Sequence, residues 1–217
     1  MGHRSFYLIE IPLKYFFAMV ALLVIAACTP TPTALEEDWK WIRESSSEWS
    51  LEEGILKLRT QPDRIWAGEG SKNLLITKLP IGERAQAFAD VELVDAIGKW
   101  EQCGLLVYQD DDHFVKLIVE HSDGPHFVVM AHELGGKRKV VTKTEIPVNR
   151  AQLRLEVEGD EVRGYWRLSE SEPWQLASAT PSPDLETRRF GLFSQDGPRD
   201  EERYALVRQL SLDLVSP

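Results

Sequence analysis

Cysteine is scarce in this chain, with two residues among 217. Two cysteines cannot form the disulfide network that holds a small secreted scaffold together. Basic residues are also under-represented, since 25 Lys and Arg stand against 35 Asp and Glu and the net charge is −10. That balance argues against a nucleic-acid-binding protein, which usually carries a basic face. Hydrophobic content of 43% and charged content of 28% are ordinary for a globular protein, so intrinsic disorder is disfavoured.

The N-terminal apolar run is too short to cross a membrane. Tyr15 to Ala27 holds 13 residues without a charge, whereas a spanning helix needs about 20. The run follows Arg4 and Lys14, and it fits the apolar region of a secretory signal. It ends in Ile25-Ala26-Ala27-Cys28, and small residues before a cysteine resemble the bacterial lipobox. The resemblance implies cleavage before Cys28 and acylation of its thiol, with a plain signal peptide as the alternative.

The chain is therefore expected to have three parts. Residues 1–27 form a lipoprotein signal peptide, residues 28–37 a lipidated tether, and residues 38–217 one β-sandwich domain. The expected location is the bacterial cell envelope, facing the periplasm or the exterior. The acidic body is not attracted to anionic lipid, so the lipid anchor alone would make the membrane contact.

Residues after Leu35 follow an all-β pattern. Short runs alternate between apolar and polar residues, as in 54–59, 87–93 and 152–157, and period two predicts half-buried strands. Turn residues such as Asp110-Asp111-Asp112 and Gly135-Gly136 separate the runs. Helix is expected only as a turn or two within 35–43 and 184–189. Regularly spaced strands predict a two-sheet antiparallel jelly-roll sandwich.

Alternation also predicts which side chains face away from the core. In the expected strand 113–121, Val115, Leu117 and Val119 share one face and Lys116 and Glu120 the other. A face that mixes donors, acceptors and an aromatic ring on neighbouring strands suits recognition of a polyol. A solvated charged face is the alternative. The candidate ligand-binding residues are Lys116, Glu120, Arg154, Arg163 and Tyr165.

Several segments resemble a known superfamily. The opening residues 39–44 and 54–58, the central hairpin 104–117, and residues 166–170, Trp174 and 191–194 resemble concanavalin A-like sandwiches of the lectin/glucanase type. The chain is similar to the family called domain of unknown function 1349 and to the accessory sandwich of family 43 glycosidases, over residues 38 to about 215. The resemblance implies a two-sheet jelly roll and no activity, because a fold does not fix a function.

Catalytic and metal-binding patterns are missing. A glucanase strand carries Glu-x-Asp-x-x-Glu, but Trp41 and Arg163 stand where the third acid belongs after residues 36–38 and 158–160. The four histidines between 113 and 132 lack the spacing of a zinc site. Residues 110–112 could ligate calcium, although a solvated hairpin turn is the simpler interpretation. We therefore expect no catalytic residue, no cofactor and no metal.

Seven tryptophans could fill a core or stack on sugar rings. Trp66 and Trp174 fall in expected rim loops and offer an alternative site. Three hypotheses follow: a carbohydrate-binding module at the cell surface, a structural or interaction protein of the envelope, and a glycoside hydrolase. The partners expected are a carbohydrate and the membrane, with no nucleic acid; the sequence names no protein partner.

Overall fold

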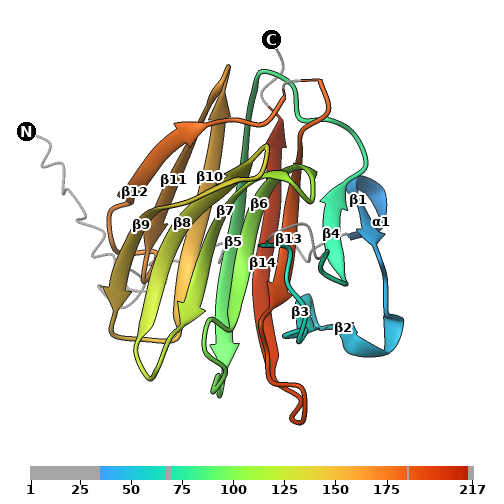
Figure 1. Ribbon diagram of the computed structural model, residues 1–217, viewed down its shortest axis with the longest axis vertical. Coiled ribbons are helices and arrows are strands. Elements are labelled where there is room, and N and C mark those ends of the chain that lie inside the picture. The colour runs from blue at the N-terminus through green and yellow to red at the C-terminus, as the bar shows by residue number, and fades with distance from the viewer. Residues whose placement is uncertain (1–34, 67–69, 185, 215–217) are drawn as a thin grey trace, which may run out of the picture. The chain divides into compact units, whose positions relative to one another are not determined.

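Two antiparallel seven-stranded sheets stack face to face in this chain (Figure 1). The computed structural model describes residues 35–66, 70–184 and 186–214. We call the first sheet sheet A; in spatial order it contains β1 (Trp39–Ile42), β4 (Leu74–Thr77), β13 (Arg189–Gln195), β6 (Gln102–Asp110), β7 (His113–His121), β8 (His126–Leu134) and β9 (Lys137–Ile146). We call the second sheet B; it contains β12 (Gln175–Pro181), β11 (Glu161–Arg167), β10 (Arg150–Glu158), β5 (Arg84–Val94), β14 (Tyr204–Leu214), β3 (Ile55–Arg59) and β2 (Trp49–Glu52).

Helix is limited to short segments in the described residues. The α-helix α1 covers Leu35–Asp38, and the 3-10 helix η2 covers Ser46–Glu48. The expected all-β, two-sheet antiparallel sandwich is thus confirmed. Leu35 lies in the segment expected to be a tether, yet its side chain is buried in the core.

The main core lies between the two sheets. Alternate residues of β7 and β10, such as Val115 and Leu117 facing Leu153 and Leu155, belong to one buried cluster. On β11 the burial alternates strictly, with Val162, Gly164 and Trp166 inward. The period-two pattern of the sequence therefore places these strands correctly.

A second apolar cluster covers part of the outer face of sheet A. It combines Phe114 and Ile118 of β7 with residues of β6, β8 and β13. Ile65, in the segment that joins β3 to β4, completes the cluster, and Trp66 packs against it. The sequence predicted that this face of β7 meets water; that expectation is wrong, because Phe114 and Ile118 are buried in a cluster that Ile65 of the β3–β4 loop completes.

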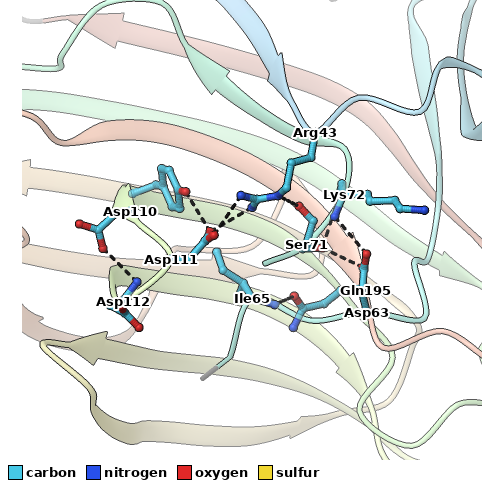
Figure 2. Close-up of polar contacts among 10 residues, drawn as sticks. Arg43, Asp63, Ile65, Ser71, Lys72, Asp110, Asp111, Asp112 and Gln195 are labelled. Atoms are coloured by element: carbon cyan, nitrogen blue, oxygen red, sulfur yellow. Dashed lines mark hydrogen bonds and ion pairs between the residues drawn. The ribbon is translucent and has the colours of Figure 1, made fainter. Parts of the chain in front are cut away.

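Polar contacts hold the β3–β4 loop (residues 60–73, of which 60–66 and 70–73 are described) in place (Figure 2). Arg43 donates to the Ser71 carbonyl oxygen at 2.6 Å and binds the Asp111 carboxylate through two contacts of 2.9 and 3.0 Å. The Asp63 carboxylate accepts from Ser71 Oγ and from the Lys72 N–H, each at 3.3 Å.

The other side of this loop is joined to the end of β13. The Ile65 N–H donates to Gln195 Oε1 at 2.8 Å, and the Asp196 N–H donates to the Asp63 carbonyl at 3.2 Å. Gly197 follows, and a Cβ at this position would lie 2.1 Å from the Thr60 carbonyl oxygen. Only glycine allows so close an approach, so the loop and the 195–197 turn form one unit.

The expected signal peptide and lipidation site lie outside the described residues. Within residues 35–66, 70–184 and 186–214, no helix has the length and hydropathy of a membrane span.

Candidate functional site

A pocket of about 310 Å³ lies on the outer face of sheet A, beside the β3–β4 loop. This volume is at the lower end of the range for small-molecule sites, roughly 300–1,000 Å³. Strands β6 to β9 form its floor and one wall. The remaining walls come from the β3–β4 loop, the β5–β6 loop and the residue that follows β13. Its lining residues are Arg64, Trp66, Trp100, Gln102, Lys116, Glu120, Val129, Ala131, Val140, Lys143 and Asp196.

Lys116 is the central cation of the pocket. Its side chain is 6% exposed, and its Nζ donates to Gln102 Oε1 at 2.8 Å. The same Nζ lies 4.6 Å from the centre of the Trp66 ring. Burial lowers the pKa of Lys116 to about 8, against the nearby carboxylates of Glu120 and Asp196, which raise it. The ammonium is therefore costly to keep in this position.

Glu120 and Lys143 form the first ion pair of the pocket. Lys143 Nζ on β9 lies 2.8 Å from Glu120 Oε1 on β7, and Glu120 is 8% exposed. Lys143 also lies over the Phe127 ring at 4.1 Å. This pair bridges β8, which runs between the two strands. It fixes the carboxylate at one side of the pocket.

Asp196 supplies the second carboxylate, from the turn after β13. Arg64 Nε lies 3.3 Å from its Oδ1, and the amides of Gln102 and Gln195 each donate to its Oδ2 at 3.1 Å. Burial raises the pKa of Asp196 to about 6, although Arg64 and Lys116 act in the opposite direction. Together with the first pair, these groups offer donors and acceptors at fixed positions, which suits hydroxyl groups on a ligand.

Two tryptophans flank the polar floor. Trp66 packs edge-on against Phe114 with ring centroids 6.0 Å apart, so the second apolar cluster supports it. Trp100 is 47% exposed and has a backbone φ of +69°, which a bulky residue rarely adopts. The backbone N–H of Trp100 donates to the His121 carbonyl oxygen at 2.9 Å. The backbone carbonyl of Trp100 accepts a hydrogen bond from the side-chain amide of Gln102 at 2.8 Å. A strained, exposed aromatic residue beside a pocket is a feature of functional sites.

The structure separates the five candidate residues from the sequence into two groups. Lys116 and Glu120 lie in the pocket on sheet A. Arg154 on β10 and Arg163 and Tyr165 on β11 belong to sheet B. The expectation that all five share neighbouring strands is wrong, because alternation identifies the face of a strand but not its sheet. The role of each residue in binding stays a prediction.

On sheet B, guanidinium groups stack on aromatic rings. The Arg154 guanidinium carbon lies 4.6 Å from the centre of the Tyr165 ring and 4.6 Å from that of Trp174. Arg154 also pairs with Glu156 at 3.0 Å, and Arg163 pairs with Glu158 at 3.0 Å. Each arginine is thus paired with a carboxylate on the same sheet.

The aspartates of the β6–β7 turn have protein partners. Asp110 Oδ1 accepts from the Asp112 N–H at 2.9 Å, and Asp111 binds Arg43 and the Tyr108 hydroxyl (Figure 2 shows the aspartate and arginine contacts). In the part of the chain that the structure describes, no three His, Cys, Asp or Glu side chains gather in an arrangement suited to a metal ion.

Sequence reasoning missed four members of the pocket that come from outside regular strands or at strand ends: Arg64, Trp100, Gln102 and Asp196. The sequence contains only a weak indication of these residues. Trp100 stands in a polar segment between two apolar runs, where a core role is hard to explain.

The two sheets define a concanavalin A-like β-sandwich, and the pocket described above lies on the outer face of sheet A. The chain belongs to the family described as the beta xylosidase C-terminal Concanavalin A-like domain, which matches residues 31–208. The resemblance to the accessory sandwich of family 43 glycosidases is thereby confirmed, and that to domain of unknown function 1349 stays a prediction. No curated protein matches the chain.

Solved structures share the fold at low sequence identity. The GH43 protein BlXynB of Bacillus licheniformis is 18% identical with a TM-score of 0.71, over 82% of this chain and 37% of that one. A functionally unknown protein of Saccharomyces cerevisiae is 19% identical with a TM-score of 0.66, over 83% and 98%. The carbohydrate binding module CBM66 of Bacillus subtilis is 17% identical with a TM-score of 0.54, over 81% and 95%. The chain thus spans under two fifths of the GH43 protein and nearly all of the other two.

Proposed function

We propose that this chain is a membrane-anchored, non-catalytic protein that binds carbohydrate at the cell surface. The observation that carries the proposal is the pocket itself, in which Trp66 and Trp100 flank a floor of fixed donors and acceptors. Aromatic rings offer their faces to the apolar C–H face of a sugar ring, and charged pairs can redirect hydrogen bonds to its hydroxyls. The likeness to a carbohydrate binding module of similar length supports this proposal.

The shape of the pocket favours the end of a sugar chain over its middle. The β3–β4 loop fills the part of the sheet face on the β6 and β13 side, and Trp66 and Arg64 stand at the boundary. A long polymer lying across the sheet would collide with this loop. A terminal sugar can instead approach over β9, where Val140 is 56% exposed.

The test is a glycan array probed with the full-length chain in a detergent that carries no sugar head group. Hits are then measured by calorimetry on the wild type, on Trp100→Ala and on Tyr165→Ala. Loss of one stacked ring face should reduce the binding free energy by about 1–2 kcal/mol, which corresponds to a loss of affinity of about five- to thirtyfold. Trp100→Ala should weaken binding by this factor and Tyr165→Ala should not. If no glycan binds, the interaction-protein hypothesis replaces this one.

A glycoside hydrolase is the second candidate, because the pocket holds two carboxylates whose environments differ. Lys143 neutralises Glu120, whereas burial raises the pKa of Asp196 to about 6, as in a general acid. Release of reducing sugar from array hits, followed on the wild type, on Asp196→Asn and on Glu120→Gln, decides between the two functions. Turnover that either variant abolishes would establish a hydrolase.

A further inference from the structure

We propose that the pocket selects an acidic sugar, a terminal hexuronate whose carboxylate pairs with Lys116. This inference rests on the proposed carbohydrate-binding function and names the ligand class of the same site. Its starting point is a charge count on the pocket lining. Three cations, Arg64, Lys116 and Lys143, face two carboxylates, Glu120 and Asp196, so the lining carries a net charge of 3 − 2 = +1. The chain as a whole carries −10.

Both carboxylates already have a cation of their own. Lys143 Nζ lies 2.8 Å from Glu120, and Arg64 Nε lies 3.3 Å from Asp196. Two amides donate to Asp196 as well. Neither carboxylate is therefore left to neutralise the third cation by direct contact.

Lys116 is that third cation. Among the described residues, its ammonium contacts the neutral amide oxygen of Gln102 and the face of Trp66, and no carboxylate lies within ion-pair distance. An ammonium has three donors and no acceptor. A nearly fully buried cation without a contacting anion is costly. Such groups cluster at functional sites, where a bound ligand can supply the missing anion.

The neighbourhood favours a carboxylate on a ring over a bare anion. Trp66 and Trp100 line the same pocket as the Lys116 amine, so apolar ring surface for a sugar lies beside the cation, and the two ion pairs provide partners for hydroxyls. The net charge of +1 on the described lining residues matches the single negative charge of a uronate. A phosphate dianion would instead need a second cation.

The experiment compares matched sugars by calorimetry on the full-length chain at pH 7. The probes are methyl glucuronide against methyl glucoside, and methyl galacturonide against methyl galactoside, in which a carboxylate replaces a hydroxymethyl group. We expect at least one uronide to bind at least fivefold more tightly than its neutral partner. Sodium acetate and inorganic phosphate test whether an anion without a sugar ring suffices.

Variants assign the selectivity to one amine. Lys116→Met and Lys116→Gln should abolish the preference for the uronide, whereas Lys139→Met removes the same charge from an exposed position on β9 and should retain it. Far-UV circular dichroism of each variant checks that it is folded.

The pH dependence provides a second readout. Lys116 faces Glu120 on its own strand, Glu133 on β8, Asp196 after β13 and Arg64 in the β3–β4 loop, while Lys143 on β9 pairs with Glu120. Burial lowers the pKa of Lys116 to about 8. Affinity for the uronide should fall as the pH rises above this value, and affinity for a neutral sugar should not follow the same curve.

The outcomes separate the two proposals. Equal binding of uronide and neutral sugar, or a preference that survives Lys116→Met, overturns the inference and leaves carbohydrate binding standing. Acetate or phosphate binding as tightly as the uronide would show an anion site and not a sugar-acid site. If the array yields hits but every uronide fails, only the inference falls, whereas an array without hits removes both.

Discussion

At the scale of single residues, Lys116 is the group for which function and stability conflict. It lies on a strand between Phe114 and Ile118, which are buried in the second apolar cluster. Its amine contacts one neutral amide oxygen and an aromatic ring. A hydrophobic residue would fit this position at lower cost. The proposed uronate ligand would account for the charge.

This conflict predicts that Lys116→Met stabilises the chain at neutral pH. Burial lowers the folded-state pKa of Lys116 to about 8 from 10.5, so below pH 8 the folded protein carries a penalty that the unfolded chain does not. The gain in unfolding free energy should be on the order of 2 kcal/mol at pH 7. It should shrink as the pH rises from 8 to 10.5, because the native amine is then neutral. Urea titrations at pH 7, 9 and 10 measure the difference.

The matched control is Lys143→Met, which removes an ion-paired lysine from the same pocket and leaves Glu120 without its cation. That variant should lose stability at pH 7. If Lys116→Met is also less stable than the wild type at pH 7, the amine is stabilised by its surroundings and the conflict does not exist.

The sequence could predict Lys116 and Glu120 but not the pocket around them. Alternation along β7 places both residues opposite Val115 and Val119, and the two apolar clusters agree, since Val115 and Val119 belong to the main core whereas Phe114 and Ile118 belong to the second cluster. It could not show that Phe114 and Ile118, on the same face, are covered, because the cover is a loop far away in the chain. Arg154 and Tyr165 fit the same pattern on sheet B, since a period of two carries no information on sheet order.

At the scale of elements, the β3–β4 loop converts an open sheet face into a pocket. Ile65 fills the second apolar cluster, and Arg64 and Trp66 form one side of the site. The described residues of the loop belong to neither sheet, and the bonds from Arg43, Asp63 and Gln195 help to fix their position (Figure 2). Fold prediction from strand patterns cannot find such an element, because its contacts with Arg43 and Gln195 join segments that are distant in the sequence.

We predict that Arg43→Met weakens sugar binding more than it weakens the fold. The Arg43–Asp111 pair is partly exposed, with side chains 36% and 26% accessible, so its loss should cost about 1 kcal/mol or less in stability. Freed from Ser71 and Asp111, the loop should hold Trp66 less firmly, and affinity should fall about threefold or more. Calorimetry and urea unfolding on the same samples separate the two effects.

Arg84→Met offers the comparison, since Arg84 forms an exposed ion pair with Glu158 on sheet B. It should leave affinity unchanged. An unchanged affinity in Arg43→Met as well would mean that the apolar contacts of Ile65 hold the loop without help.

At the scale of the whole molecule, the chain combines a proposed anchor with a proposed binding face. The sequence places Cys28 after small residues at the end of the apolar run, and the sandwich begins within ten residues of it. A lipid anchor adds about 0.8 kcal/mol for each buried CH₂, so more than one acyl chain holds a soluble domain stably. Surface-bound sites would then act at high local concentration on polymeric sugars.

The anchor predicts a change in phase partitioning. Wild type produced in a bacterium that processes lipoproteins should enter the detergent phase of a Triton X-114 separation. Cys28→Ser removes the acyl acceptor, so that variant should lose lipidation, and mass spectrometry of the N-terminal peptide should show no diacylglyceryl group. Cys103→Ser changes the other, buried cysteine and should leave lipidation intact. A wild type that stays in the aqueous phase contradicts the anchor.

The central claim is that sugar binds on the outer face of sheet A, and the indole N–H signals of the tryptophans test it most directly. The seven tryptophans give separate reporters: Trp66 and Trp100 line the pocket, whereas Trp174 precedes β12 and packs against Arg154 of sheet B. The ¹⁵N-labelled chain is titrated with its best array ligand, and single Trp→Phe variants assign the signals. The account predicts that Trp66 and Trp100 shift along one saturable curve while Trp174 stays in place. A shift of Trp174 with Trp66 and Trp100 unchanged would contradict it and move the site to the opposite sheet.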